Sequence, residues 1–182
     1  ALAQGNVRRL LAYSAIAHAG ALLLGVIAAG HAGPAPLYFY AATSNLATVG
    51  AFGVIAVAER SGRCEPLTDL AGLRQRSPLL AGCLFVFVLS LAGIPPLAGF
   101  FGKFAVFAAA LKLGGATSLA GGLTILAIFL SAVALYYYLL ILKQAWVAAP
   151  AKDAPAIRVP ATAAIALIVA AGLLIALGVW PS

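Results

Sequence analysis

Long apolar runs separated by short polar stretches dominate this chain. A helix that crosses a bilayer core needs about 20 apolar residues, and five runs reach that length. We therefore predict an all-α integral membrane protein. The five expected transmembrane helices cover residues 10–29, 37–58, 79–112, 119–141 and 159–179.

Positive charge is distributed unevenly between the two ends of these helices. Lys112 is the one basic residue expected on one side, whereas residues 59–78 and 143–158 form charged loops on the other. By the positive-inside rule, these two loops are expected to be cytoplasmic, in the inner membrane of a bacterium. The basic residues on that side are Arg8, Arg9, Arg60, Arg63, Arg74, Arg76, Lys143, Lys152 and Arg158.

Composition supports the membrane assignment. Of 182 residues, 64% are hydrophobic and 8% are charged, whereas soluble domains carry about 25% charged residues. The net charge of +7 therefore reflects membrane orientation and not nucleic-acid binding. Cys64 and Cys83 offer neither a disulfide framework nor a metal site. Because the chain lacks methionine and opens with Ala1, we expect a fragment of a longer protein.

The third apolar run is too long for one straight crossing and contains helix breakers near its middle. Pro95 and Pro96 lack an amide hydrogen, and Gly93 and Gly99 flank them. We therefore expect the helix to unwind there. Freed carbonyls at membrane depth are tolerated where protein or an internal water cavity satisfies them. The alternative is a simple packing kink.

Lys103 makes this break a candidate functional site. Nine residues separate it from Lys112, or roughly 13 Å of helix, which places it inside the hydrocarbon region. A charge at that depth costs several kcal/mol unless it is paired, hydrated or deprotonated. Transporters build ion sites from an unwound helix beside a buried ionisable group. We therefore interpret Lys103 as a proton-relay residue; the alternative is a lysine that snorkels to the surface.

Polar residues in the other predicted helices form a possible axis. Histidine is the side chain that most readily titrates near neutral pH. His18 follows Tyr13 and Ser14 at helical spacing, which makes these three residues a candidate hydrogen-bonded stripe; a simply packed histidine is an equal alternative. Ser44 and Tyr137 are further candidates for the same interior. The remaining polar residues of these helices are Asn45, Thr48, Ser131, Tyr136 and Tyr138. The sequence contains no catalytic triad, phosphate-binding loop, metal-ligand cluster or redox-cofactor motif.

Three segments resemble a known family. Residues 6–20 (NVRRLLAYSAIAHAG), residues 90–104 (SLAGIPPLAGFFGKF) and the YYYL motif at 136–139 are similar, in that order, to segments of the antiporter-like membrane subunits of respiratory complex I. Within this family, Lys103 between Gly102 and Phe104, together with the triple tyrosine, resembles the subunit N branch. Subunit M usually has glutamate at the lysine position.

The resemblance implies a fourteen-helix protein with two inverted five-helix repeats. This chain would then hold the second repeat and the terminal helix. Lys103 matches the broken-helix lysine that exchanges protons in this family, and His18 falls at a position on the polar axis. The partners would be other membrane subunits, lipid and protons. NADH, FMN, iron–sulfur clusters and quinone would belong to other subunits.

The leading functional hypothesis is a proton-translocating, non-redox membrane subunit of NADH–quinone oxidoreductase. It would couple quinone reduction elsewhere to proton transfer through Lys103. One alternative is a subunit of a cation/proton antiporter or of a membrane-bound hydrogenase of the same family. Another is a structural membrane subunit that conducts nothing. The 19 glycines would favour this role, because small residues allow helices to pack closely.

Overall fold

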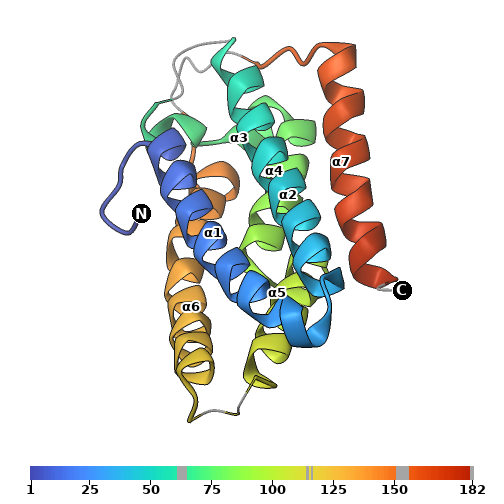
Figure 1. The fold of residues 1–182 in the computed structure, drawn as a ribbon. Coiled ribbons are helices and arrows are strands. Elements are labelled where there is room, and N and C mark those ends of the chain that lie inside the picture. The colour runs from blue at the N-terminus through green and yellow to red at the C-terminus, as the bar shows by residue number, and fades with distance from the viewer. Residues whose placement is uncertain (61–64, 114, 116, 151–155, 181–182) are drawn as a thin grey trace.

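The protein is a helical bundle in a computed structural model that describes residues 1–60, 65–113, 115, 117–150 and 156–180. Arg63, Cys64 and Lys152 lie outside the described residues. The regular elements assigned in the described part are all helices (Figure 1). They are α1 (Val7–Ala32), α2 (Ala35–Glu59), the 3₁₀ turn η1 (Leu67–Leu70), α3 (Leu73–Arg76), α4 (Pro78–Ala92), α5 (Ala98–Leu111), α6 (Leu119–Trp146) and α7 (Ala161–Val179).

Four of these helices are long and apolar enough to cross a membrane, namely α1, α2, α6 and α7. The apolar helices α4 and α5 are shorter, with 15 and 14 residues. They replace the single long segment expected over residues 79–112. The predicted class, an all-α membrane protein, is confirmed.

Helix α2 lies at the centre of the bundle and packs against α1, α4, α5 and α7. Helix α6 covers α1, α4 and α5, while α7 stands at the opposite edge (Figure 1). Small residues permit close approach of these helices, as is usual in membrane bundles. At Gly50 of α2, a Cβ atom would lie 2.5 Å from the fully buried Phe87 ring of α4.

Local signals fix where the helices begin. The side chain of Asn6 accepts a hydrogen bond from the amide of Arg9 and caps α1. The Ser118 hydroxyl accepts one from the amide of Gly121 and caps α6 in the same way. Each cap satisfies one of the amide groups that the first turn of a helix leaves without a partner.

The polar stretch expected as a loop over residues 59–78 contains η1 and α3. It is joined to α1 by backbone hydrogen bonds from Val7 N to Glu65 O and from Leu67 N to Gly5 O. An ion pair between Arg8 and Glu59 joins the start of α1 to the end of α2. Helix α6 continues to Trp146, past the expected boundary at residue 141, so Lys143 lies in its last turn.

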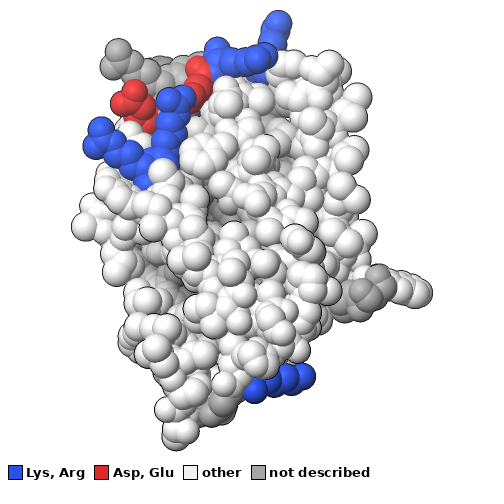
Figure 2. Space-filling view, viewed as in Figure 1, with Lys and Arg blue, Asp and Glu red and all other residues white. Residues whose placement is uncertain are grey.

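Charged side chains gather at one end of the bundle. Figure 2 shows the acidic and most of the basic atoms where α1 begins and α2 ends, with a wide uncharged surface below. This band of uncharged surface is what a protein embedded in lipid requires.

Candidate functional site

The site is built on the interruption between α4 and α5. Helix α4 ends at Ala92, and Gly93 follows with a φ of 80°, a left-handed conformation that glycine adopts without steric penalty. A helix end leaves its last four carbonyls without intrahelical partners. Two of these carbonyls accept from the backbone: Leu89 O from the amides of Gly93 and Ile94, and Ser90 O from the amide of Gly93.

Lys103 satisfies the other two carbonyls. Its Nζ donates to Leu91 O at 2.9 Å and to Ala92 O at 3.2 Å. A third hydrogen bond, at 3.1 Å, reaches Ser131 Oγ on α6. An ammonium group has three N–H donors, so these three acceptors match its full donor capacity. The side chain is 9% exposed and does not snorkel to the surface.

The carbonyl end of α4 contributes a favourable electrostatic interaction with the Lys103 ammonium. The carbonyl end of a helix carries partial negative charge, which stabilises a nearby cation by about 0.3–1 kcal/mol at exposed positions and by up to about 2 kcal/mol when partly buried. In the described part of the chain, the hydrogen-bond partners of Lys103 are neutral oxygens. Loss of a proton from Lys103 therefore leaves no negatively charged group unpaired among these three partners.

His18 of α1 is the centre of a second group of polar side chains. Its Nδ1 lies 2.6 Å from the Tyr40 hydroxyl of α2, and its Nε2 lies 3.0 Å from the Tyr138 hydroxyl of α6. The Tyr138 hydroxyl also forms a hydrogen bond with Ser14 Oγ. The result is a continuous chain Ser14–Tyr138–His18–Tyr40 through three helices, with all four residues buried.

The hydrogen-bonded side chains Ser14, Tyr138, His18 and Tyr40 are all groups that can both donate and accept a proton. A neutral imidazole donates through one ring nitrogen and accepts through the other. One tyrosine hydroxyl must therefore donate to His18 while the other accepts from it. Delivery of a proton to the accepting nitrogen, with loss of a proton from the other, exchanges the two tautomers. The two hydroxyls then reverse their roles.

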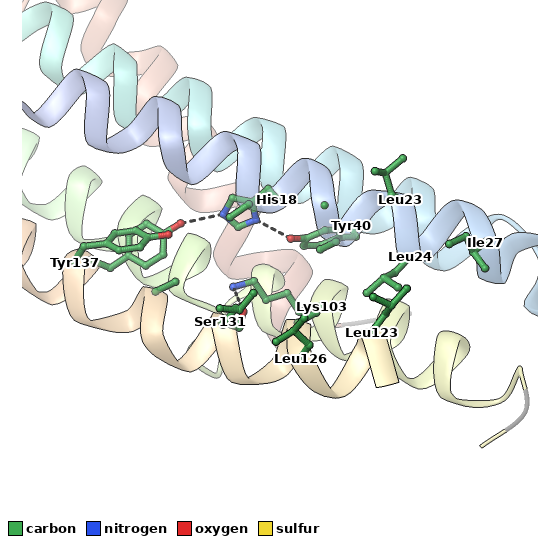
Figure 3. A pocket seen from close by; sticks show the side chains of 17 residues that line it. His18, Leu23, Leu24, Ile27, Tyr40, Lys103, Leu123, Leu126, Ser131 and Tyr137 are labelled. Atoms are coloured by element: carbon green, nitrogen blue, oxygen red, sulfur yellow. Dashed lines mark hydrogen bonds between the residues drawn. The ribbon is translucent and has the colours of Figure 1, made fainter. Parts of the chain in front are cut away.

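Lys103 and His18 line one cavity of about 450 Å³ between α1, α2, α5 and α6. In Figure 3, Lys103 points toward Ser131, and His18 and Tyr40 lie across the cavity from them. The polar lining residues are His18, Tyr40, Lys103, Ser131, Tyr137 and Tyr138. The rest of the wall is formed by leucine, isoleucine, alanine and glycine residues.

The structure places the other sequence candidates in different settings. Ser44 does not line this cavity, and its hydroxyl donates to Tyr40 O of its own helix at 2.6 Å. Tyr13 is 49% exposed and lies away from the His18 face, contrary to the expected stripe. Pro95 and Pro96 form the exposed part of the interruption, and the buried Gly99 amide donates to Ser90 Oγ at 3.2 Å.

Two residues of the Ser14–Tyr138–His18–Tyr40 chain were not among the site candidates predicted from the sequence. Tyr40 lies near the start of α2, and its only sequence signal is its position one turn before Ser44. Tyr138, and not Tyr137, is the tyrosine whose hydroxyl meets His18, although Tyr137 is buried beside it and lines the cavity.

Comparison with known proteins gives consistent matches. The family model described as "NADH:quinone oxidoreductase/Mrp antiporter, TM" matches residues 1–131. NADH-quinone oxidoreductase subunit N 2 of Acidobacterium capsulatum is 54% identical over the whole chain, and subunit N of Polaromonas naphthalenivorans is 41% identical. The chain spans 36% and 38% of the lengths of these two relatives.

Solved structures agree with this result. A chain of respiratory complex I from Thermus thermophilus, solved with bound aureothin, is 41% identical with a TM-score of 0.82. The match covers 99% of this chain and 39% of the other. A chain of the Mrp complex from Dietzia sp. shares the fold at 22% identity and a TM-score of 0.79, over 97% of this chain and 40% of that one. The expected resemblance to antiporter-like subunits of complex I is therefore confirmed, and the chain belongs to the NADH:quinone oxidoreductase/Mrp antiporter family of membrane subunits.

Proposed function

We propose that this chain is part of a proton-translocating membrane subunit of NADH–quinone oxidoreductase, in which Lys103 takes up and releases protons. The observation that carries the proposal is the position of Lys103. Its amine is buried on the carbonyl end of an interrupted helix, and Lys103 lines one cavity with His18, Tyr40 and Tyr138.

The proposed topology has five crossings. Helices α1, α2, α6 and α7 each cross the membrane, and α4 and α5 together make the fifth crossing, interrupted at residues 93–97. The charged end of the bundle faces the cytoplasm in a bacterial inner membrane, by the positive-inside rule. In this arrangement the chain is the second inverted repeat of an antiporter-like fold followed by its terminal helix.

The proposed mechanism is electrostatic. Quinone reduction in other subunits changes the field along the membrane, and this field alters the proton occupancy of Lys103. The released proton crosses the hydrated cavity to the tyrosine–histidine chain, which passes it on by exchange of the His18 tautomer. NADH, FMN, iron–sulfur clusters and quinone belong to those other subunits, so this chain moves protons and transfers no electrons.

A second candidate function is that of a cation/proton antiporter subunit. The same family model supports it, because its description includes Mrp antiporters. Sequence relatives favour the first candidate, because relatives at 40% to 54% identity carry the name NADH-quinone oxidoreductase subunit N. A non-conducting structural role is opposed by Lys103, since packing alone gives no reason to bury a charge.

The test is NADH-driven proton uptake by inverted membrane vesicles that contain the full-length subunit. Lys103→Ala is compared with Lys112→Ala, because Lys112 ends the same helix but is exposed. We expect proton uptake and NADH oxidation to fall several-fold in the first variant and to remain near wild type in the second, with the complex assembled in both. Unchanged uptake in an assembled Lys103→Ala complex would overturn the proposal.

A further inference from the structure

Lys103 and Ser131 separate two cavities. The second cavity, of about 420 Å³, lies between α5, α6 and the end of α4. Its wall is largely apolar and includes Ile94, Phe104 and Phe107. Among the described residues, Lys103 and Ser131 are the two that line both cavities. The hydrogen bond between them therefore lies on the boundary between the His18 side and the apolar side.

The three acceptors around the Lys103 amine are not equivalent. Leu91 O and Ala92 O belong to the backbone of α4, and a carbonyl oxygen only accepts hydrogen bonds. Ser131 Oγ is a hydroxyl on another helix, and it both accepts and donates. When the ammonium loses a proton, the neutral amine keeps two N–H donors and gains a lone pair. Ser131 is the one partner of the three that has a proton to offer to that lone pair.

We propose that Ser131 is a positioning residue that holds Lys103 at the boundary of the two cavities in both protonation states. The Ser131 hydroxyl accepts a hydrogen bond from the ammonium and, after rotation about its C–O bond, donates one to the neutral amine. The two remaining N–H groups of the amine match the two α4 carbonyls. The lysine thus keeps its place through a full cycle of proton loss and gain.

The surroundings of Lys103 make this partner important. The titratable side chains that line a cavity with it are His18 of α1, Tyr40 of α2, and Tyr137 and Tyr138 of α6, all on the first cavity. Helix α4 presents backbone carbonyls, α7 has no titratable side chain, and the described lining of the second cavity has none besides Lys103. Without the Ser131 hydroxyl, the lone pair of the neutral amine would therefore find no side-chain donor in the described lining of the second cavity.

Two matched variants, Ser131→Thr and Ser131→Val, test this role. Threonine and valine have nearly the same shape, but only threonine keeps the hydroxyl. We expect Ser131→Thr to retain NADH-driven proton uptake within about twofold of wild type and Ser131→Val to lose roughly tenfold, as for loss of a hydrogen bond to a charged group. Ser131→Ala, which adds no volume, should behave like Ser131→Val. Thr124→Val is the control, because the Thr124 hydroxyl donates to Ala120 O of the same helix, away from Lys103.

The measurement uses the full-length subunit in the assembled complex, with assembly checked for each variant. Equal uptake by Ser131→Thr and Ser131→Val, whether high or low, would overturn the role of the hydroxyl. This inference rests on the proposed function, and Lys103→Ala measured in parallel separates the two. A defect in Lys103→Ala with equal Thr and Val variants refutes only the role of Ser131, whereas no defect in Lys103→Ala refutes the function itself.

Discussion

The Tyr138 hydroxyl of α6 lies 3.0 Å from Nε2 of His18 on α1. The same oxygen is hydrogen-bonded to Ser14, one helical turn before His18. Tyr138 is therefore the link through which the imidazole reaches Ser14. Without its hydroxyl, the chain from Tyr40 would end at His18.

Tyr138→Phe tests this link. The ring and its packing are kept while the hydroxyl is removed, so we expect proton uptake to slow on the order of a hundredfold, as for loss of a proton-transfer group. Tyr136→Phe is the matched control, because Tyr136 lies on the same helix and is 58% exposed. Equal rates in the two variants would show that protons bypass Tyr138.

The close approach of α5 to α4 predicts a second effect, on assembly. A Cβ atom at Gly99 would lie 1.9 Å from Ser90 O, and a backbone carbonyl cannot move away cheaply. We expect Gly99→Ala to destabilise the subunit by about 3 kcal/mol or more, as for severe overpacking. The amount of assembled complex and its thermal midpoint should both fall. The control is Gly122→Ala, which has open space around the added methyl group; comparable midpoints in the two variants would contradict this packing.

Helix α7 gives a third prediction, since it supports the interruption from the outside. A Cβ atom at Gly178 would lie 2.1 Å from Pro96 O and 2.6 Å from Ala98 N. We expect Gly178→Ala to displace the residues before α5 and to lower both assembly and proton uptake. Gly172→Ala, in the same helix with nothing within 4 Å of the new atom, should be tolerated. Wild-type behaviour of both variants would mean that α7 does not fix the interruption.

The sequence was sufficient to predict the membrane class and the interruption of one apolar segment. Apolar runs of about 20 residues indicate transmembrane helices, because helices of soluble proteins rarely contain them. Lys103 was recognisable because a charge within such a run is costly. Pro95 and Pro96 marked the interruption, since proline removes an amide that a continuous helix needs.

The partners in the site could not be predicted in the same way. Successive helical residues point about 100° apart, so the rotation of α6 decides which of three adjacent tyrosines meets His18. The role of Tyr40 depends on how α1 packs on α2, which no local pattern specifies. Ser44 satisfies its hydroxyl on its own helix, an option open to any serine in a helix. Tertiary packing, and not residue type, decides which side chains join the hydrogen-bonded chain around His18.

Proton exchange by Lys103 is tested most directly by Lys103→Arg. Arginine keeps the positive charge but does not release its proton in proteins. The measurement is the number of protons taken up per NADH oxidised by inverted vesicles, with Lys103→Ala alongside and assembly verified. We predict that Lys103→Arg is as defective as Lys103→Ala, because a fixed charge cannot complete the cycle. Wild-type proton uptake in Lys103→Arg would contradict the account, because charge alone would then suffice.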